Sequence, residues 1–157
     1  MAAVQTTYTE NIRVSLPGVV GNMREWDADT LICETAAGIG FGVAVGQGTA
    51  ANGGVLGAAS AATFRGVSIR SQTLNPANLE KYAQYDNMAV LTKGDIWVTV
   101  GGDVTVGGDA TFVASTGVLS SAGTSGSQFA ISGARWMTAA SNGGLALLRL
   151  EGPTPAA

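Results

Sequence analysis

The feature that most constrains the fold is the regular alternation of glycine turns with short runs of β-branched and aromatic residues. It is clearest in residues 93–113, KGDIWVTVGGDVTVGGDATFV, which read twice as a Gly-Asp turn followed by a short strand. Glycine supplies the positive φ of tight turns, aspartate bonds its own backbone, and β-branched residues suit a pleated surface. The strands expected here are 96–100, 104–106 and 110–113. No catalytic dyad or ligand cluster lies among them.

The same pattern continues on both sides of this region. Further strands are expected at 31–33, 39–45, 64–69, 88–92, 129–131, 134–138 and 145–150. Short strands every eight to twelve residues with glycine-rich turns predict a mainly β fold, a compact antiparallel β-barrel or β-sandwich. At most one short helix is expected, capped by Asn75, with Pro76 at its first position and its end by Asp86. A structured loop is the alternative there.

Residues 39–45 show the strand pattern most strictly. Apolar side chains recur at every other position, which places them on one face, while the opposite face carries only glycine and alanine. Such a bare face lets another backbone approach closely. The following residues, 46–63, are expected to form a long loop with Val55 and Leu56 as its larger apolar anchors.

The length of 157 residues predicts one domain with one core. Residues 1–18 are polar with scattered apolar positions and end in a Leu-Pro-Gly turn signal, which indicates an extended N-terminal arm. Residues 19–151 are expected to form a single β domain. From its composition, the tail at 152–157 is expected to be disordered.

The charge content argues against several classes of partner. Only 12% of residues are charged and the net charge is −3, where roughly a quarter charged is typical. The basic residues are too few and scattered for nucleic-acid binding. No apolar run is long enough to span a membrane. Because no secretory signal is expected either, we expect the protein to be made in a cytoplasm. A neutral surface repels neighbouring molecules weakly, which suits a subunit that packs against other copies or against another protein. The alternative is a soluble monomer with an unusually neutral surface.

Catalytic and metal chemistry find little support in the sequence. There is no histidine, and the single cysteine, Cys33, is expected to be an apolar strand residue rather than a reactive thiol. The glycine-rich 38–48 stretch lacks the strand-loop-helix context of a nucleotide site. Glu25, Asp27 and Asp29 could form a metal site or a hydrolytic carboxylate pair, but a solvated edge or turn is favoured. We therefore expect no enzyme activity, no cofactor and no metal.

Several motifs occur in an order that is characteristic as a set. They are Tyr8-Thr-Glu-Asn11 with Pro17-Gly18, Glu34-Thr-Ala-Ala-Gly38-Ile-Gly-Phe-Gly42, Phe64-Arg-Gly-Val-Ser-Ile69, Lys93-Gly-Asp-Ile-Trp-Val98, Gly133-Ala-Arg-Trp136 and Gly143-Gly-Leu-Ala-Leu-Leu-Arg-Leu150. In this order the chain resembles the structural cement proteins, or capsid decoration proteins, of tailed phages. The resemblance covers nearly the whole chain.

The resemblance implies a small, mainly β, non-enzymatic protein without a cofactor. Such a protein attaches to the outside of an icosahedral head, clamps neighbouring major capsid subunits, works as a homodimer or homotrimer, and is found in the virion. The family has no fixed contact motif, so interface candidates come from residue type and position: Tyr8, Asn11, Ile12, Leu16, Trp26, Val55, Leu56, Tyr82, Tyr85 and Trp97. The alternative is a carbohydrate-binding or adhesive β module that stacks sugars on its aromatic residues.

Overall fold

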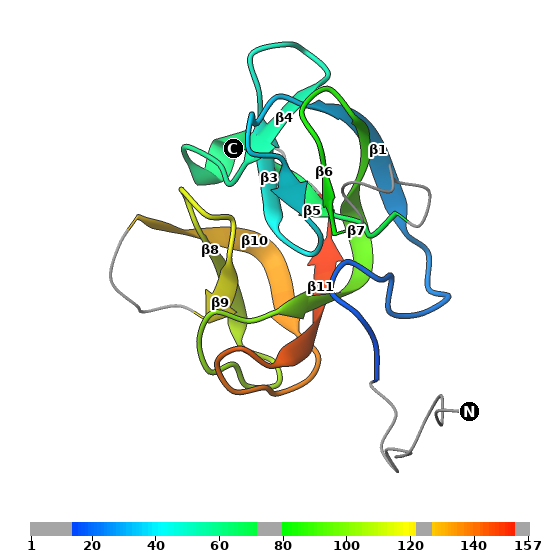
Figure 1. The fold of residues 1–157 in the computed structure, drawn as a ribbon. Helices are drawn as coiled ribbons and strands as arrows, with labels where there is room; N and C mark the ends of the chain where they lie inside the picture. Colours follow the sequence, from blue (N-terminus) through cyan, green and yellow to red (C-terminus); the bar gives the residue numbers. More distant parts are fainter. Residues whose placement is uncertain (1–13, 72–79, 122–126, 153–157) are drawn as a thin grey trace, which may run out of the picture.

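The long strand β7 (Asn87–Thr99) is shared by the two halves of the molecule (Figure 1). The computed structural model describes residues 14–71, 80–121 and 127–152. Nine strands form one sheet in the order β1-β4-β3-β5-β7-β11-β10-β8-β9, with β1 also pairing β7. The first half of β7 therefore belongs to one set of neighbours and its second half to another.

The first half is a closed five-stranded barrel, which confirms the predicted mainly β class and the barrel alternative. Its strands, besides β7, are β1 (Asp27–Cys33), β4 (Gly53–Leu56), β3 (Ala44–Gln47) and β5 (Phe64–Ser68). The β1–β4 pair is parallel and the other pairs are antiparallel. Antiparallel pairing of β1 with β7, from Asp27 opposite Lys93 to Ile32 opposite Asn87, closes the barrel.

The second half extends the sheet from the other end of β7. Its strands are β11 (Leu145–Glu151), β10 (Gln128–Trp136), β8 (Asp109–Val113) and β9 (Leu119–Ser121). A parallel bridge between Val100 and Leu119, with the Gly101 amide 2.8 Å from the Leu119 carbonyl oxygen, brings β9 back to the end of β7. These strands therefore also curl round on themselves (Figure 1).

Each half has its own cluster of buried side chains. The cluster of the first barrel is Leu31, Cys33, Ile39, Phe41, Val45, Tyr82, Met88 and Val90. The larger cluster is centred on the second half and contains Ile96, Val98, Phe112, Leu119, Trp136 and Leu148, with contributions from Val67 and Leu91 of the barrel. A small sheet of β2 (Ile39–Gly40) and β6 (Lys81–Tyr82) adds Ile39 and Tyr82 to the first cluster.

The predicted turn at Lys93-Gly94-Asp95 is wrong, because these residues lie inside β7. The residues before Gly94 pair with β1 and those after it pair with β11, so hydrogen-bonded partners hold the strand extended throughout. Gly94 has φ 123°, and a Cβ there would lie 2.6 Å from the Cβ of Trp26. The glycine thus serves a close contact within a strand. The second Gly-Asp signal is confirmed, since a turn precedes β8, but Val104 forms only an isolated bridge and 104–106 is no strand.

Residues 39–45 do not form the single continuous strand that was expected, but the apolar side chains expected on its buried face are buried. A turn at Phe41-Gly42, where Gly42 has φ 69°, separates β2 from β3. Ile39, Phe41 and Val45 are nevertheless buried together, with Val43 packed against them.

Three other element predictions need correction. Residues 46–63 are not a loop, because they contain the end of β3, β4 and a 3-10 turn, η1 (Ala61–Thr63). Most of the predicted helix start lies outside the described residues, and Lys81–Tyr82 form β6 rather than helix. The two strands expected near 129–138 are the single strand β10, whose bulge includes Gly133 at φ 74°.

Candidate functional site

The segment of residues 14–26, here called the arm-root segment, carries most of the large exposed apolar side chains in the described part of the chain. Val14 is 79% exposed, Leu16 40%, Met23 100% and Trp26 48%. The other two such residues, Tyr85 and Val106, lie elsewhere. An apolar surface concentrated in one segment is typical of a protein contact.

Backbone hydrogen bonds fix the arm-root segment to one edge of β7. The Gly18 amide donates to the Trp97 carbonyl at 2.7 Å, the Trp97 amide donates to the Val19 carbonyl at 2.9 Å, and the Gly21 amide donates to the Asp95 carbonyl at 2.7 Å. β11 occupies the opposite edge of the same residues. The arm-root segment is therefore a short extra partner of β7 whose position is set by the sheet.

A tight turn at residues 16–19 directs the chain away from β7. Pro17 and Gly18, with Gly18 at φ 82°, occupy the central positions that a type II turn favours, and the Val19 amide donates to the Leu16 carbonyl at 3.2 Å. Arg70 holds the turn from outside: its backbone amide donates to Gly18 at 2.7 Å and its Nε to the Pro17 carbonyl at 3.0 Å. The exit direction of residues 14–16 is thereby fixed.

The turn also packs on a glycine of the first barrel. A Cβ on Gly42 would lie 2.9 Å from the Gly18 nitrogen, so the two backbones touch only because neither residue has a side chain. Gly42 lies in the turn between β2 and β3, and a Cβ on Gly40 would meet nothing within 4 Å, so the close approach expected along the glycine and alanine face of 39–45 is found here at Gly42.

A buried ion pair ties the middle of the arm-root segment to the sheet. Asp95 is almost completely buried, and Arg149 donates to it through Nε at 2.8 Å and Nη2 at 2.9 Å. Asn22 donates its Nδ2 hydrogen to the same carboxylate. The bonds from Arg149, helped by Asn22 and opposed by burial, hold the pKa of Asp95 below its ordinary value. The charged carboxylate is thus the form that holds the arm-root segment.

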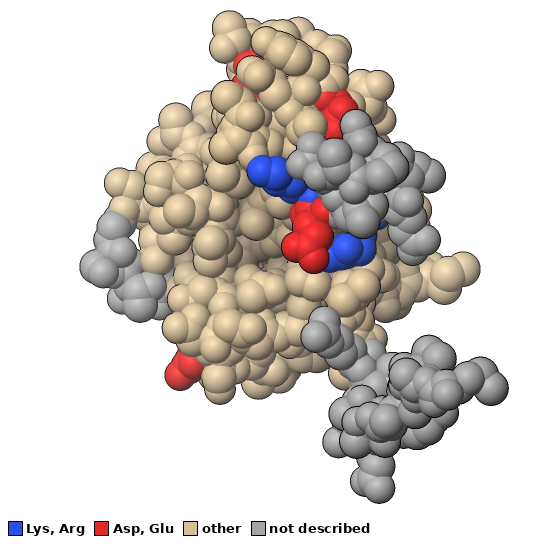
Figure 2. Space-filling model, viewed as in Figure 1, with Lys and Arg blue, Asp and Glu red and all other residues tan. Residues whose placement is uncertain are grey.

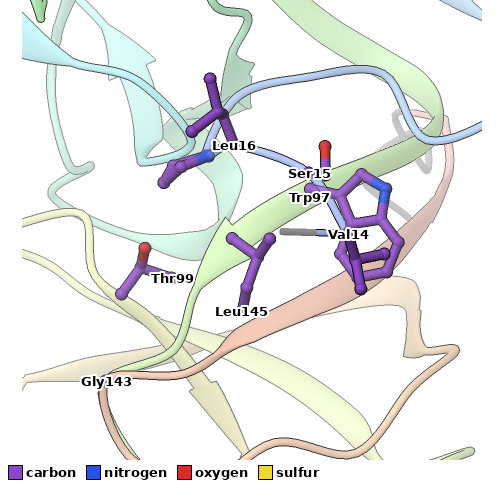
Figure 3. A pocket seen from close by; sticks show the side chains of 8 residues that line it. Val14, Ser15, Leu16, Trp97, Thr99, Gly143 and Leu145 are labelled. Atoms are coloured by element: carbon purple, nitrogen blue, oxygen red, sulfur yellow. The ribbon is translucent and has the colours of Figure 1, made fainter. Parts of the chain in front are cut away.

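A pocket of about 360 Å³ lies between the turn and β7. Its walls are Val14, Ser15, Leu16, Pro17, Trp97, Thr99, Gly143 and Leu145, none of them charged (Figure 3). In Figure 3, Leu16 and Ser15 lie above β7, Val14 lies beside Trp97, and Gly143 and Leu145 lie lower in the view. An uncharged pocket of this kind can receive apolar side chains or a short extended peptide, and it offers no group for acid-base chemistry.

The structure brings two of the predicted interface candidates, Leu16 and Trp97, to the same pocket. Leu16 and Trp26 belong to the arm-root segment, and the partly buried Trp97 lines the pocket beside Leu16. Tyr8, Asn11 and Ile12 lie outside the described residues. Val14, Met23 and Asp95 were missed by sequence reasoning. Asp95 was interpreted as a turn residue, and a lone Met or Val in a polar stretch gives no signal of exposure.

The other candidates lie away from the arm-root segment. Val55 and Leu56 are partly buried on β4, and Tyr85 is exposed with φ 70°. Tyr82 is 2% exposed, and its hydroxyl donates to the Ile69 carbonyl at 2.6 Å, so its side chain belongs to the core. Burial accordingly raises the pKa of Tyr82.

Two of the three acidic residues near Trp26 pair with different basic residues. The Glu25 carboxylate lies 3.5 Å from the Lys93 Nζ atom. The Asp29 carboxylate lies 3.2 Å from the Arg65 Nη2 atom. Within residues 14–71, 80–121 and 127–152, no three Asp, Glu, His or Cys side chains gather as a metal site would require. The Cys33 thiol is buried, which raises its pKa and disfavours the thiolate.

The surface is largely neutral, as the composition predicted. Figure 2 shows a face covered mostly by uncharged side chains, with small groups of charged ones between wide neutral areas. No helix in the described ranges is long and apolar enough to cross a membrane.

Comparisons with known proteins agree with this picture. The family model described as "Structural cement protein (E217 gp24/Pam3 gp6)" matches residues 4–151. A chain in the solved capsid of Myoviridae Phage XM1 is similar in fold, with a TM-score of 0.74 and 14% sequence identity over 96% of this chain and 98% of that one. No curated protein matches the sequence.

Proposed function

Because the chain belongs to the structural cement protein family of phages, we propose that it decorates the outside of an icosahedral head and clamps neighbouring major capsid subunits together. A structural role in association with the capsid follows from the family itself. The outer location and the bridging of neighbouring subunits are the proposal. It includes a non-enzymatic role without a cofactor, nucleic acid or membrane partner, and self-association as a homodimer or homotrimer of a protein made in the host cytoplasm.

The observation that carries the proposal is the exposed apolar arm-root segment on a rigid support. Interfaces draw their affinity from a few apolar and aromatic anchors held in place before binding, because ordering flexible chains costs free energy. Val14, Leu16 and Met23 are such anchors, and the pairing with β7 holds them in position. Repetition of weak contacts over a lattice would multiply their effect.

The same observation favours a protein contact over a sugar contact. Sugar stacking needs flat aromatic faces, whereas three of the four large exposed apolar side chains in the arm-root segment are aliphatic or thioether groups. Trp26 is the exception.

The test is binding of purified protein to heads assembled without it. Deleting residues 1–16 should leave a folded body and weaken binding. Met23→Ser should weaken binding by about tenfold, the loss of one apolar anchor, without lowering the melting temperature. Val106→Ser is the matched control, since Val106 is also exposed but lies in the turn before β8. Equal binding by wild type, Met23→Ser and the deletion would contradict the assigned surface, and absence of any binding would contradict the function.

A further inference from the structure

The turn between β6 and β7 holds an exposed tyrosine in a backbone conformation that tyrosine rarely adopts. The Asp86 amide donates to the Ala83 carbonyl at 3.1 Å, which closes a four-residue turn with Tyr85 at its third position. Tyr85 has φ 70°, and it is the only non-glycine residue in the described ranges with a positive φ. A type II turn favours glycine or asparagine at this position, and a bulky side chain there is strained. The turn alone therefore gives no reason for a tyrosine.

The end of β1 holds this strained turn in place. The Tyr85 amide donates to the Cys33 carbonyl at 2.7 Å, and the Cys33 amide donates to the Asp86 carbonyl at 3.0 Å. The Asp86 carboxylate accepts a further hydrogen bond from the Ala83 amide at 2.8 Å. The Tyr85 side chain itself is 74% exposed. Strain that the surrounding structure maintains beneath an exposed side chain indicates a use for that side chain.

A second connection, between β3 and β4, is fixed to the same end of β1. Its Thr49 and Ala50 amides donate to the carboxylate of Glu34, the residue after β1, at 2.7 Å and 2.9 Å. Residues 49–52 are exposed and carry no charged side chain. Figure 1 shows this connection and the turn before β7 at the same end of the first barrel. Residues 49–52 and 84–85 are here called the barrel-end surface.

The barrel-end surface and the arm-root segment lie at opposite ends of β1. Trp26, the last residue of the arm-root segment, directly precedes Asp27 at the start of the strand, whereas Cys33 at its end bonds Tyr85. A strand rises about 3.3 Å per residue, so β1 separates the two surfaces by about 20 Å. A closed barrel keeps this separation fixed. Two surfaces placed in this way can contact two neighbouring molecules at once.

Resting on the proposed function, we propose that the barrel-end surface is the second contact of the bridge. It binds a major capsid subunit other than the one that the arm-root segment binds. Tyr85 offers an aromatic ring and a hydroxyl group, a combination in which binding energy concentrates when a partner covers it. The nearby carboxylates of Glu34 and Asp86 already accept hydrogen bonds from this protein's own amides. The matching surface on the capsid subunit is therefore an uncharged pocket with a hydrogen-bond partner for the tyrosine hydroxyl.

Tyr85→Gly separates the effect on binding from the effect on folding. Glycine removes the side chain and adopts a positive φ without strain, so the melting temperature should stay the same or rise. Binding to heads assembled without the protein should weaken by about tenfold. Tyr85→Phe, which keeps the ring, should lose less, and Val106→Ser is the control for an exposed apolar residue elsewhere. Unchanged binding by Tyr85→Gly would overturn the inference. Weaker binding that comes only with a lower melting temperature would show a structural role for Tyr85 and would overturn it too.

A variant with photo-crosslinking amino acids at both positions 23 and 85 tests the bridge itself. It is bound to heads that lack the protein and irradiated, and denaturing electrophoresis with mass spectrometry counts the capsid subunits joined to each copy. We expect one copy joined to two major capsid subunits, whereas variants with a cross-linker at only one of the two positions should give one-to-one products. Copies joined to fewer than two capsid subunits, whichever position links them, would overturn the inference and leave head binding intact. Failure of the wild-type protein to bind heads would instead contradict the proposed function.

Discussion

Asp95 shows how one residue connects the sheet to the arm-root segment. It is buried on β7, accepts two hydrogen bonds from Arg149, and accepts another from Asn22 of the arm-root segment. Removing its charge would leave a guanidinium without its partner in a mostly buried place, and such losses are costly. The residue therefore stabilises both β7–β11 packing and the position of the arm-root segment.

We expect Asp95→Asn to lower the free energy of unfolding by about 3 kcal/mol at pH 7. The matched control is Asp109→Asn, whose partner Arg135 is exposed and whose loss should cost less than about 1 kcal/mol. Denaturant unfolding of both variants measures the difference. Equal costs would show that the buried pair has no special weight.

The pH dependence of this difference follows from the lowered pKa of Asp95. A carboxylate with a folded pKa below its unfolded value, about 3.9, contributes its full stability above that value. The contribution is lost as pH falls through the folded pKa. The gap between wild type and Asp95→Asn should therefore be constant near neutrality and shrink below about pH 4. A gap that is unchanged in strong acid would contradict this explanation.

At the scale of elements, the hairpin of β3 and β4 depends on a carboxylate from β1's end. Glu34 accepts hydrogen bonds from the amides of Thr49 at 2.7 Å and Ala50 at 2.9 Å. The hydrogen bond from the Ala50 amide, and after it the one from the Thr49 amide, hold the pKa of Glu34 below its ordinary value. A Cβ on Gly53 would overlap the Glu34 carboxylate, so the glycine makes room for it. The connection thus has a definite shape.

We expect Glu34→Gln to speed amide hydrogen exchange at Thr49 and Ala50 at pH 7, because glutamine has one acceptor oxygen where the carboxylate has two. In the wild type the same protection should be lost as pH falls through the lowered pKa of Glu34. Nuclear magnetic resonance measures both. Glu25→Gln, which removes a surface ion pair with Lys93, is the control and should leave these two amides unchanged.

The Glu34 contact also explains why sequence reasoning failed at 46–63. Composition indicated a loop, since small polar residues carry no strand pattern, but the Thr49 and Ala50 amides of this segment donate to the distant Glu34 carboxylate, which orders it. At 93–95 the local Gly-Asp signal for a turn was overridden by strand partners on both sides. Where the apolar run was strong, as at residues 145–150, the strand was predicted correctly.

The candidate site was predictable only in its aromatic and leucine members. Leu16, Trp26 and Trp97 were expected from residue type; Leu16 and Trp97 line one pocket, and Leu16 and Trp26 are exposed. Tyr82 was an interface candidate for the same reason, its residue type, yet it is buried. Its burial comes from the β2–β6 pairing and from contacts with residues far away in the sequence. Residue type indicates capacity for binding, whereas tertiary packing decides exposure.

At the scale of the whole molecule, two buried clusters share one strand. Leu31 belongs to the first cluster and Leu148 to the second, and β7 lies in both halves. A strand that pairs with β1 at one end and β11 at the other cannot be lost from one half alone. The two halves should therefore unfold together.

We expect Leu31→Ala and Leu148→Ala each to lower the free energy of unfolding by about 2 to 5 kcal/mol. Both should shift the same single transition, measured by calorimetry and by tryptophan fluorescence. The conservative variants Leu31→Met and Leu148→Met, which keep most of the volume, should cost less than about 1.5 kcal/mol. Two separate transitions, one responding to each variant, would show that the halves are independent.

Cryo-electron microscopy of heads with and without the protein tests whether it sits on the outside of the shell and bridges capsid subunits. We expect additional density on the outer surface, over junctions between neighbouring major capsid subunits, with the arm-root segment facing the shell or another copy. Density inside the shell, or seated on a single subunit away from every junction, would contradict it.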